Sequence, residues 1–215
     1  MYERKNTFFI LSMRSDTYLT IKAFSQGLFK EKGSRFIALA YPVSTQEEIK
    51  SILENIRKEH HAARHHCFAW VLGQSRQMHR VSDDGEPSGS AGKHILGQIN
   101  ASELTNILIV VVRYFGGKLL GISGLINAYR SAAESAINNS EITEHFIRDY
   151  FELIFPYSSV NDVMKIIKDE EIKQSHHKFE LECSMTINFR TSARERILNA
   201  LSRIEGLKYR HTGTF

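Results

Sequence analysis

Apolar residues follow either an alternating or a helical spacing along the first part of the chain, and polar breaks separate these stretches. The alternating stretches predict strands at Thr7–Met13, Thr17–Phe24 and Ser34–Tyr41. A helix is expected over about residues 45–60, because apolar residues recur at helical spacing after a capping box at Ser44–Glu47.

The centre of the predicted sheet is the run from Asn106 to Val112, in which β-branched residues dominate. Such a run is typical of a strand buried on both faces. Cys67–Leu72 alternates and predicts a further strand, and the segment 95–99 indicates a short helix. A helix rich in small residues is expected after the glycines at 116–124.

The pattern restarts after Ser140, which we take as the boundary between two domains, residues 1–140 and 141–215. The second part predicts the order β-α-β-α-β, in which the stretch 172–190 is long enough to hold two strands as a hairpin. The expected elements are a strand at Tyr150–Phe155, a helix around 160–167, strand residues at Phe179–Phe189, a helix with a capping box at Ser192–Glu195, and a strand at Lys208–Thr212. This order favours a ferredoxin-like domain within an α+β fold class.

Composition places the chain among folded proteins, with 215 residues, 42% hydrophobic and 24% charged. Two cysteines, Cys67 and Cys183, are too few for a disulfide framework, and no apolar run approaches the length of a membrane helix. We therefore expect a cytoplasmic protein without membrane contact.

The net charge of +4 divides into 17 basic against 12 acidic residues in 1–140 and 11 against 12 in 141–215. This basic excess favours polyanions only weakly.

An unusual loop runs from Ser82 to Lys93 and contains three carboxylates, Asp83, Asp84 and Glu86. Carboxylates this close could hold Mg²⁺ or act as an acid and base. Equally, aspartates and glycines commonly build turns and cap helices. The sequence leaves both interpretations open, and no metal site or cofactor is predicted.

The segment from Arg113 to Lys118 follows the predicted central strand and carries the glycines Gly116 and Gly117. Glycines let backbone N–H groups approach an anion at the start of the next helix, and the two cations add positive charge. The spacing fits neither a Walker A loop nor a dinucleotide fingerprint. Phosphate or nucleic-acid contact and a purely structural turn therefore both remain open here.

Histidines cluster between His60 and His66, next to Cys67. Zinc is disfavoured, because the run spans a predicted helix end and strand start and has no second ligand cluster. A packing role is favoured, with a phosphate-facing His65 or His66 as the alternative. Cys67 lies in an apolar alternation and is expected to be an inert buried thiol.

These motifs, taken together, resemble in order and spacing the bacterial YigZ branch of the YigZ/IMPACT family. The segments that carry the resemblance are Glu31–Phe36, Ala63–Trp70, Ser82–Lys93, Val112–Gly117, Leu120–Gly121, Gly124–Leu125 and Ala128–Tyr129. The resemblance covers most of residues 20–140, and the last 70 or so residues fit the family's appended domain by length and pattern.

The resemblance implies an N-terminal two-layer α/β domain similar to domain 2 of ribosomal protein S-five, followed by a ferredoxin-like domain. Together they are similar to the last two domains of elongation factor G. That pairing implies RNA, the ribosome or translation control, and no catalytic activity is securely attached to the family. The residues carried over by position are His65, Asp83, Asp84, Glu86, Arg113, Gly116, Gly117 and Gly121.

We therefore expect a nucleic-acid or ribosome-binding protein involved in the regulation of translation, rather than an enzyme. The expected phosphate contacts are Arg35, His65, Lys93, Arg113, Gly116, Gly117, Lys118 and Gly121. The alternative is a metal-dependent hydrolase of a phosphate-containing or peptide substrate, using the acidic loop. A third possibility is a protein partner docked on the C-terminal domain. The sequence predicts neither the oligomeric state nor the particular RNA.

Overall fold

The computed structural model describes residues 16–215, so the predicted strand Thr7–Met13 lies outside the described residues. The chain forms two compact units, residues 18–145 and residues 146–215 together with Asp16 and Thr17. The first unit therefore extends a few residues beyond Ser140.

A five-stranded antiparallel sheet forms the middle of the N-terminal unit, in the order β2-β3-β6-β4-β5. A separate two-stranded sheet pairs β1 with β7. The elements are β1 (Thr17–Ile21), β2 (Ser25–Glu31), β3 (Ser34–Pro42), α1 (Gln46–Glu59), β4 (His65–Leu72), β5 (Met78–Ser82), α2 (Gly92–Ala101), β6 (Ile107–Tyr114), α3 (Gly121–Asn138) and β7 (Ile142–Phe146).

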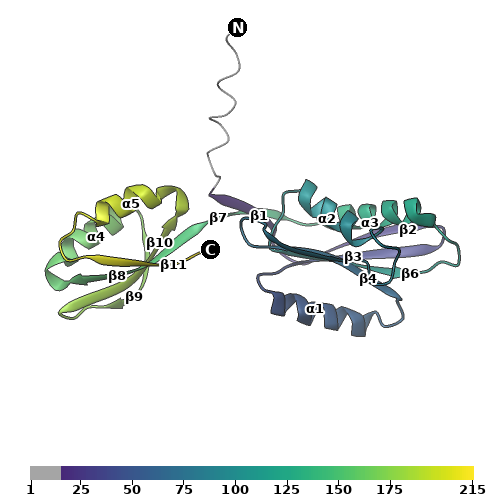
Figure 1. Cartoon of the computed structure of the whole chain (residues 1–215), viewed down its shortest axis with the longest axis horizontal. Coiled ribbons are helices and arrows are strands. Elements are labelled where there is room, and N and C mark those ends of the chain that lie inside the picture. Colours follow the sequence, from purple (N-terminus) through teal and green to yellow (C-terminus); the bar gives the residue numbers. More distant parts are fainter. Residues whose placement is uncertain (1–15) are drawn as a thin grey trace, which may run out of the picture. The chain divides into compact units, whose positions relative to one another are not determined.

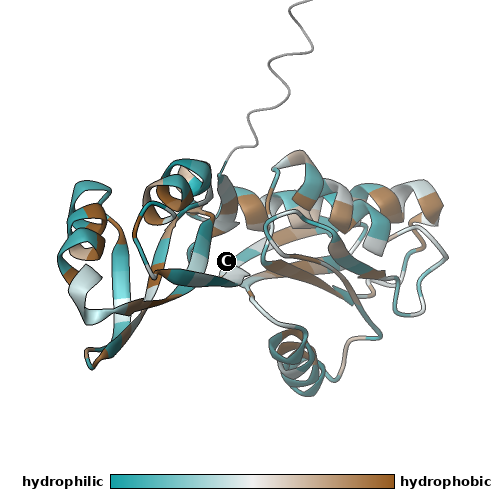
Figure 2. Cartoon of the chain, turned by 60° about the vertical axis from the view of Figure 1, so that its left-hand side comes forward, coloured by the Kyte–Doolittle hydropathy of each residue, from teal (hydrophilic) through white to brown (hydrophobic). Residues whose placement is uncertain are grey.

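Strand β6 is the central strand, as predicted, and its residues 107–113 are all buried. Helices α2 and α3 cover one face of the sheet and α1 covers the other (Figure 1). The unit thus has three layers instead of the expected two, because Ile49 and Ile56 of α1 pack on the second face with Phe68 and Trp70. The hydrophobic colouring of the central strands in Figure 2 reflects this two-sided burial.

The first helix begins one residue later than its predicted capping box implies. Thr45 is the N-cap, and its hydroxyl accepts a hydrogen bond from the Glu48 backbone N–H at 3.2 Å. The Glu48 carboxylate accepts in return from the Thr45 N–H and also from the Ser44 N–H. The box therefore joins Thr45 to Glu48 and not Ser44 to Glu47.

Four strands of this unit differ from the sequence prediction. The predicted strand Thr17–Phe24 is shorter, since β1 ends at Ile21, and β2, which starts at Ser25, was not predicted. Strands β5 and β7 were not predicted, because most of their residues are exposed and show no clear alternation of apolar and polar positions. Their backbone pairing, and not a buried face, defines them.

The C-terminal unit is a four-stranded antiparallel sheet in the order β11-β8-β10-β9, the ferredoxin-like arrangement that was predicted. Its helices α4 and α5 lie over one face of the sheet (Figure 1). The elements are β8 (Arg148–Pro156), η2 (Tyr157–Ser159), α4 (Val160–Asp169), β9 (Lys173–Lys178), β10 (Glu182–Arg190), η3 (Thr191–Ala193), α5 (Arg194–Leu201) and β11 (Lys208–Thr214).

The capping box predicted at Ser192–Glu195 does not form. Residues Thr191–Ala193 make a 3-10 turn, and α5 follows with Ala193 at its N-cap position and no side-chain cap. The Ser192 hydroxyl instead donates to the Asp16 carboxylate at 2.6 Å. Among residues 16–215, no helix is both long enough and apolar enough to cross a bilayer.

Candidate functional site

The sequence motifs of the N-terminal unit meet at one end of its sheet, which we call the motif end. Because β3 and β4 both run antiparallel to β6, their first residues lie beside its last ones: Arg35 pairs with Tyr114, and His65 pairs with Arg113. The acidic loop at 83–91 and the glycine turn at 115–120 connect to strands at this same end. Segments far apart in sequence thus form one candidate site.

Asp83 organises the acidic loop and the start of α2. Its carboxylate accepts hydrogen bonds from the backbone N–H groups of Gly89 at 2.8 Å, Ala91 at 3.1 Å and Gly92 at 2.8 Å. Burial by itself raises the pKa of Asp83, but these three donors outweigh it and the net pKa is lowered. The carboxylate therefore serves as the cap that Ala91, at the N-cap position, has no side chain to provide.

Asp84 holds the loop against the start of β4. Its carboxylate accepts from the His66 backbone N–H at 2.7 Å and lies 3.4 Å from an Arg57 guanidinium nitrogen. Its own carbonyl oxygen lies 2.8 Å from Nδ1 of His65. His65 is thus engaged with the loop backbone.

Glu86 and Arg113 form a buried ion pair beneath the loop. Arg113 Nη1 donates to Glu86 Oε1 at 2.6 Å, and the Tyr129 hydroxyl donates to the same oxygen at 2.7 Å. The Arg113 guanidinium also lies over the rings of Phe36 and Phe115. Its charge is compensated inside the protein, so Arg113 holds the loop in place and is not the phosphate contact that the sequence suggested.

Burial keeps two further groups of this cluster neutral. It raises the pKa of the Cys67 thiol to about 12, and the thiol donates to the Asp83 carbonyl oxygen at 3.0 Å. Burial likewise raises the pKa of Tyr129, which remains a hydroxyl donor to Glu86. The sequence prediction of an inert Cys67 agrees with this environment.

Gly116 locks the glycine turn onto the hairpin that joins β2 to β3. A Cβ atom at Gly116 would lie 1.9 Å from the carbonyl carbon of Gly33, so only glycine fits. The Gly116 N–H donates to the Ser34 hydroxyl at 3.1 Å. Gly117 and Gly121 have positive φ angles of 83° and 73°, and a Cβ there would meet nothing within 4 Å. Their backbone therefore faces open space.

Three predicted phosphate contacts are solvent-exposed side chains at the motif end: Arg35, Lys93 and Lys118. Lys93 stands in the first turn of α2, and Lys118 stands in the turn before α3. Helix α3 begins without a side-chain cap, so its first backbone N–H groups have no side-chain acceptor at the N-cap. These cations and N–H groups suit an anion.

Aromatic and apolar side chains accompany these cations. The Arg35 guanidinium lies 5.1 Å from the ring centre of Tyr114, whose hydroxyl lies 2.8 Å from Nδ1 of His60. Phe115 is 55% exposed and Leu119 is 84% exposed. Neither residue was among the phosphate contacts predicted from the sequence. An apolar residue placed within a polar glycine turn is the signal that could have identified both.

The structure does not bring the carboxylates of the acidic loop together. Asp83, Asp84 and Glu86 each bind a different partner, and within residues 16–215 no group of His, Cys, Asp and Glu side chains has the arrangement of a metal site. The hypothesis of a Mg²⁺-dependent hydrolase therefore loses the shared carboxylate site on which it rested.

The clustered histidines have separate environments as well. His60 contacts Tyr114, His61 contacts the Lys58 carbonyl, and the ring of His66 contacts the His60 carbonyl. Burial lowers the pKa of His66. The packing role favoured for this run agrees with these contacts.

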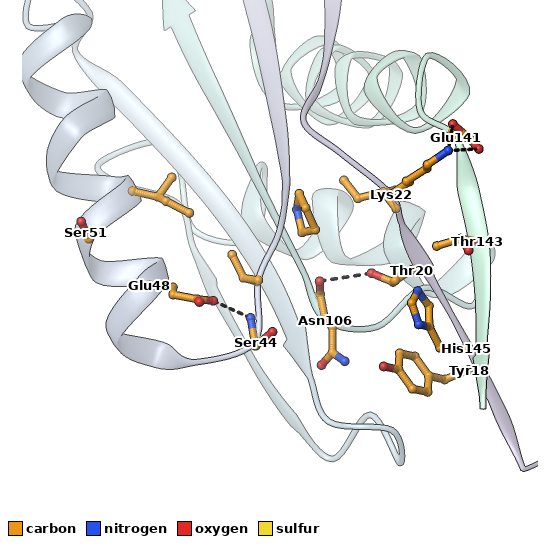
Figure 3. Close-up of a pocket in the computed structure, with 14 residues that line it drawn as sticks. Tyr18, Thr20, Lys22, Ser44, Glu48, Ser51, Asn106, Glu141, Thr143 and His145 are labelled. Atoms are coloured by element: carbon orange, nitrogen blue, oxygen red, sulfur yellow. Dashed lines mark hydrogen bonds and ion pairs between the residues drawn. The ribbon is translucent and has the colours of Figure 1, made fainter. Parts of the chain in front are cut away.

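A cavity of about 750 Å³ lies at the opposite end of the same sheet (Figure 3). Tyr18 and His145 stack at its side with ring centres 5.5 Å apart, and Lys22 pairs with Glu141 at its rim. Thr20 donates to the Asn106 carbonyl oxygen at 3.3 Å. None of the motif residues lines this cavity.

Comparison with known proteins gives consistent results. Residues 32–137 match the Impact N-terminal domain. The chain is similar to the IMPACT family member YvyE of Bacillus subtilis, with 31% identity over 86% of this chain and 84% of that protein. It is also similar to the IMPACT family member YigZ of Escherichia coli, with 46% identity over 49% of this chain and 53% of that protein.

A solved structure described as that of a hypothetical protein is similar over nearly the whole chain. It has 30% sequence identity and a TM-score of 0.68, covering 90% of this chain and 96% of that one. The similarity therefore includes both units.

Proposed function

This chain belongs to the IMPACT family, and on that premise we propose that it binds RNA or the ribosome and takes part in the regulation of translation. The motif end of the N-terminal unit is the proposed contact surface. Arg35, Lys93 and Lys118 provide the phosphate contacts, and the open backbone of the glycine turn lets the ligand approach α3.

The observation that carries the proposal is the combination of exposed cations and an exposed aromatic ring at one end of the sheet. Phosphates attract lysine and arginine without regard to base sequence, whereas the exposed face of Phe115 suits stacking with an unpaired base. The residues beneath this surface are buried and paired with one another, as Glu86 is with Arg113. They give the surface a rigid base.

The connection to translation is supported by the family. The family resemblance implies a domain pairing similar to the last two domains of elongation factor G, and the structure contains the ferredoxin-like second unit of such a pairing. Fold similarity alone does not determine function, so direct binding measurements are the test.

The test is equilibrium binding of a labelled structured RNA and of purified ribosomes across a salt series. The variant Lys93→Ala/Lys118→Ala removes two exposed cations from the motif end. The matched control Lys50→Ala/Arg130→Ala removes two exposed cations from α1 and α3, away from the motif end. Each lost phosphate contact reduces the slope of log K against log salt by about one.

We expect the slope of the motif-end variant to fall by about one to two and that of the control to match the wild type. If the salt slope falls equally in both variants, binding depends only on the overall charge, and the assignment of the contact surface to the motif end is wrong. If the wild-type chain binds neither RNA nor ribosomes at low salt, the proposed function is wrong.

A further inference from the structure

The C-terminal sheet has one face that no helix of its own unit covers. Helices α4 and α5 pack on the opposite face, against the buried residues Phe151, Leu153 and Phe155 of β8. The alternate residues of β8 and β10 are partly exposed and point away from that core. We call this uncovered side the open face.

Basic residues surround the open face. Register and alternation place these cations on it: Arg148 of β8, Lys173 and Lys178 of β9, Arg190 of β10, and Lys208 and Arg210 of β11. On β8 and β10 the acids of this face are Glu152 and Glu182. Three of the six cations are already paired with carboxylates: Arg210 with Glu152 at 2.7 Å, Lys178 with Glu180 at 3.2 Å, and Arg190 with Asp16 at 2.6 Å. The charge total of the C-terminal segment, 11 basic against 12 acidic residues, therefore conceals an uneven distribution.

Two arginines on this face stand directly opposite each other. Arg148 pairs with Arg190 in the register of β8 and β10. Like charges opposite one another destabilise a sheet unless an anion lies between or beside them. Asp16 binds Arg190 at 2.6 Å, whereas no ion pair between Arg148 and a carboxylate is found within residues 16–215. The Arg148 guanidinium donates a 3.4 Å hydrogen bond to the Asn188 side chain. Arg148 is therefore a cation available for a phosphate.

Small polar side chains fill the middle of the face. Ser184, Thr186 and Asn188 follow one another at alternate positions of β10, and Tyr150 stands across from Asn188 on β8. Hydroxyl and amide groups hydrogen-bond ribose, phosphate and base edges, and a tyrosine ring can stack on a base. A protein-binding patch usually has a large apolar centre, whereas Ile154 and Pro156 are the only aliphatic residues that β8 and β10 place on this face.

We propose that the open face of the C-terminal sheet binds a segment of single-stranded RNA, with its phosphates on the surrounding cations and its bases and riboses over the central polar residues. This proposal rests on the proposed function and adds a second RNA surface to it. The sequence suggested a protein partner for this domain, whereas the charge and polarity of the face favour a polyanion.

The experiment measures fluorescence anisotropy of a labelled polyuridine of about 16 nucleotides with the full chain, between about 50 and 200 mM salt. The variant Arg148→Ala/Lys208→Ala removes two cations from the open face. The matched control Lys165→Ala/Lys168→Ala removes two exposed lysines from α4, on the helix-covered side. Circular dichroism melting checks that every variant folds.

We expect Arg148→Ala/Lys208→Ala to weaken binding about tenfold at low salt and to flatten the salt slope by about 1.4, at 0.7 for each single-strand contact. The helix-face control should bind within about twofold of the wild type, as expected for residues without a phosphate contact. A second variant, Thr186→Glu, removes no cation but adds an anion at the centre of the face, and it should bind more weakly too.

Equal losses in the open-face and helix-face variants, or unchanged binding by Thr186→Glu, overturn the open-face proposal. If Lys93→Ala/Lys118→Ala alone reduces binding, the motif-end proposal stands and the open-face proposal is wrong. If the wild-type chain does not bind RNA, both are wrong. Binding of the same face to vesicles of anionic phospholipid, with no binding to polyuridine, also overturns the assignment to RNA.

Discussion

Arg113 Nη1 donates a 2.6 Å hydrogen bond to Glu86 Oε1, and these side chains are 8% and 3% exposed. The pair joins the central strand to the acidic loop, and Tyr129 of α3 completes it. Two charged residues that the sequence suggested as site residues thus form a buried ion pair that stabilises the fold. The surface above it, and not the pair itself, is available to a ligand.

The effects of Glu86 and Arg113 substitutions on the free energy of unfolding should depend strongly on each other. Glu86→Gln removes the charge that compensates the buried guanidinium, so we expect it to lower the free energy of unfolding by about 3–5 kcal/mol. Arg113→Met should cost a similar amount. The double variant should cost less than the two single changes combined, because neither charge is then buried alone.

Urea unfolding followed by tryptophan fluorescence measures this coupling. The chain has one tryptophan, and Trp70 lies buried in β4, so the signal reports the N-terminal unit alone. If the double variant loses as much free energy of unfolding as the two single variants combined, the two residues act independently.

Asp83→Asn should destabilise the N-terminal unit at neutral pH by about 1–2 kcal/mol, because an amide nitrogen cannot accept the N–H group of Gly89. The folded pKa of Asp83 lies below the value of 3.8 for an unperturbed aspartate. The carboxylate therefore stabilises the fold fully above the unfolded pKa, and this contribution is lost as pH falls through the folded pKa.

The matching measurement is Trp70 fluorescence during urea unfolding at a series of pH values from neutral to acid. The wild type should lose more stability than Asp83→Asn below about pH 4. Parallel pH profiles for the two proteins would contradict the assigned role of Asp83.

Gly116→Ala should prevent the close approach of the glycine turn to Gly33, since its Cβ would lie 1.9 Å from a backbone carbon. We expect a loss of about 3 kcal/mol or more. The control is Gly97→Ala in α2, where a Cβ meets nothing within 4 Å; it should stabilise the unit by about 0.5–1 kcal/mol. Thermal and urea unfolding of both variants measures the change in free energy of unfolding. Similar changes for the two variants would exclude a specific contact between Gly116 and Gly33.

The Cys67 thiol should resist alkylation and disulfide reagents in the folded protein. With its pKa raised to about 12 by burial, the reactive thiolate is scarce at neutral pH. In a Cys183→Ala variant, thiol titration should proceed only as fast as the unit unfolds, and complete labelling should follow addition of denaturant. Complete labelling within seconds in native buffer would show that the thiol is accessible.

Local pattern was sufficient for much of the fold. The unbroken apolar run at 107–112 specified a central strand, because only a strand covered on both faces buries every residue. The helical spacing around Ile49 and Ile56 specified α1, and the order of elements after residue 146 specified a ferredoxin-like sheet. These signals depend on neighbours in sequence. Exposed strands such as β5 carry no such signal, so they were missed.

The partners of charged side chains were decided only by the tertiary structure. Glu86 and Arg113 are 27 residues apart in sequence, and nothing in their spacing distinguishes a ligand from a partner. Arg148 and Arg190 meet only because β8 and β10 are neighbours in the sheet, although the strands are separated by a helix and a strand. The energy of interaction between two charges depends on their distance in space and not on their separation in sequence. The open face and the buried ion pair therefore follow from strand pairing, whereas the strands themselves follow from the sequence pattern.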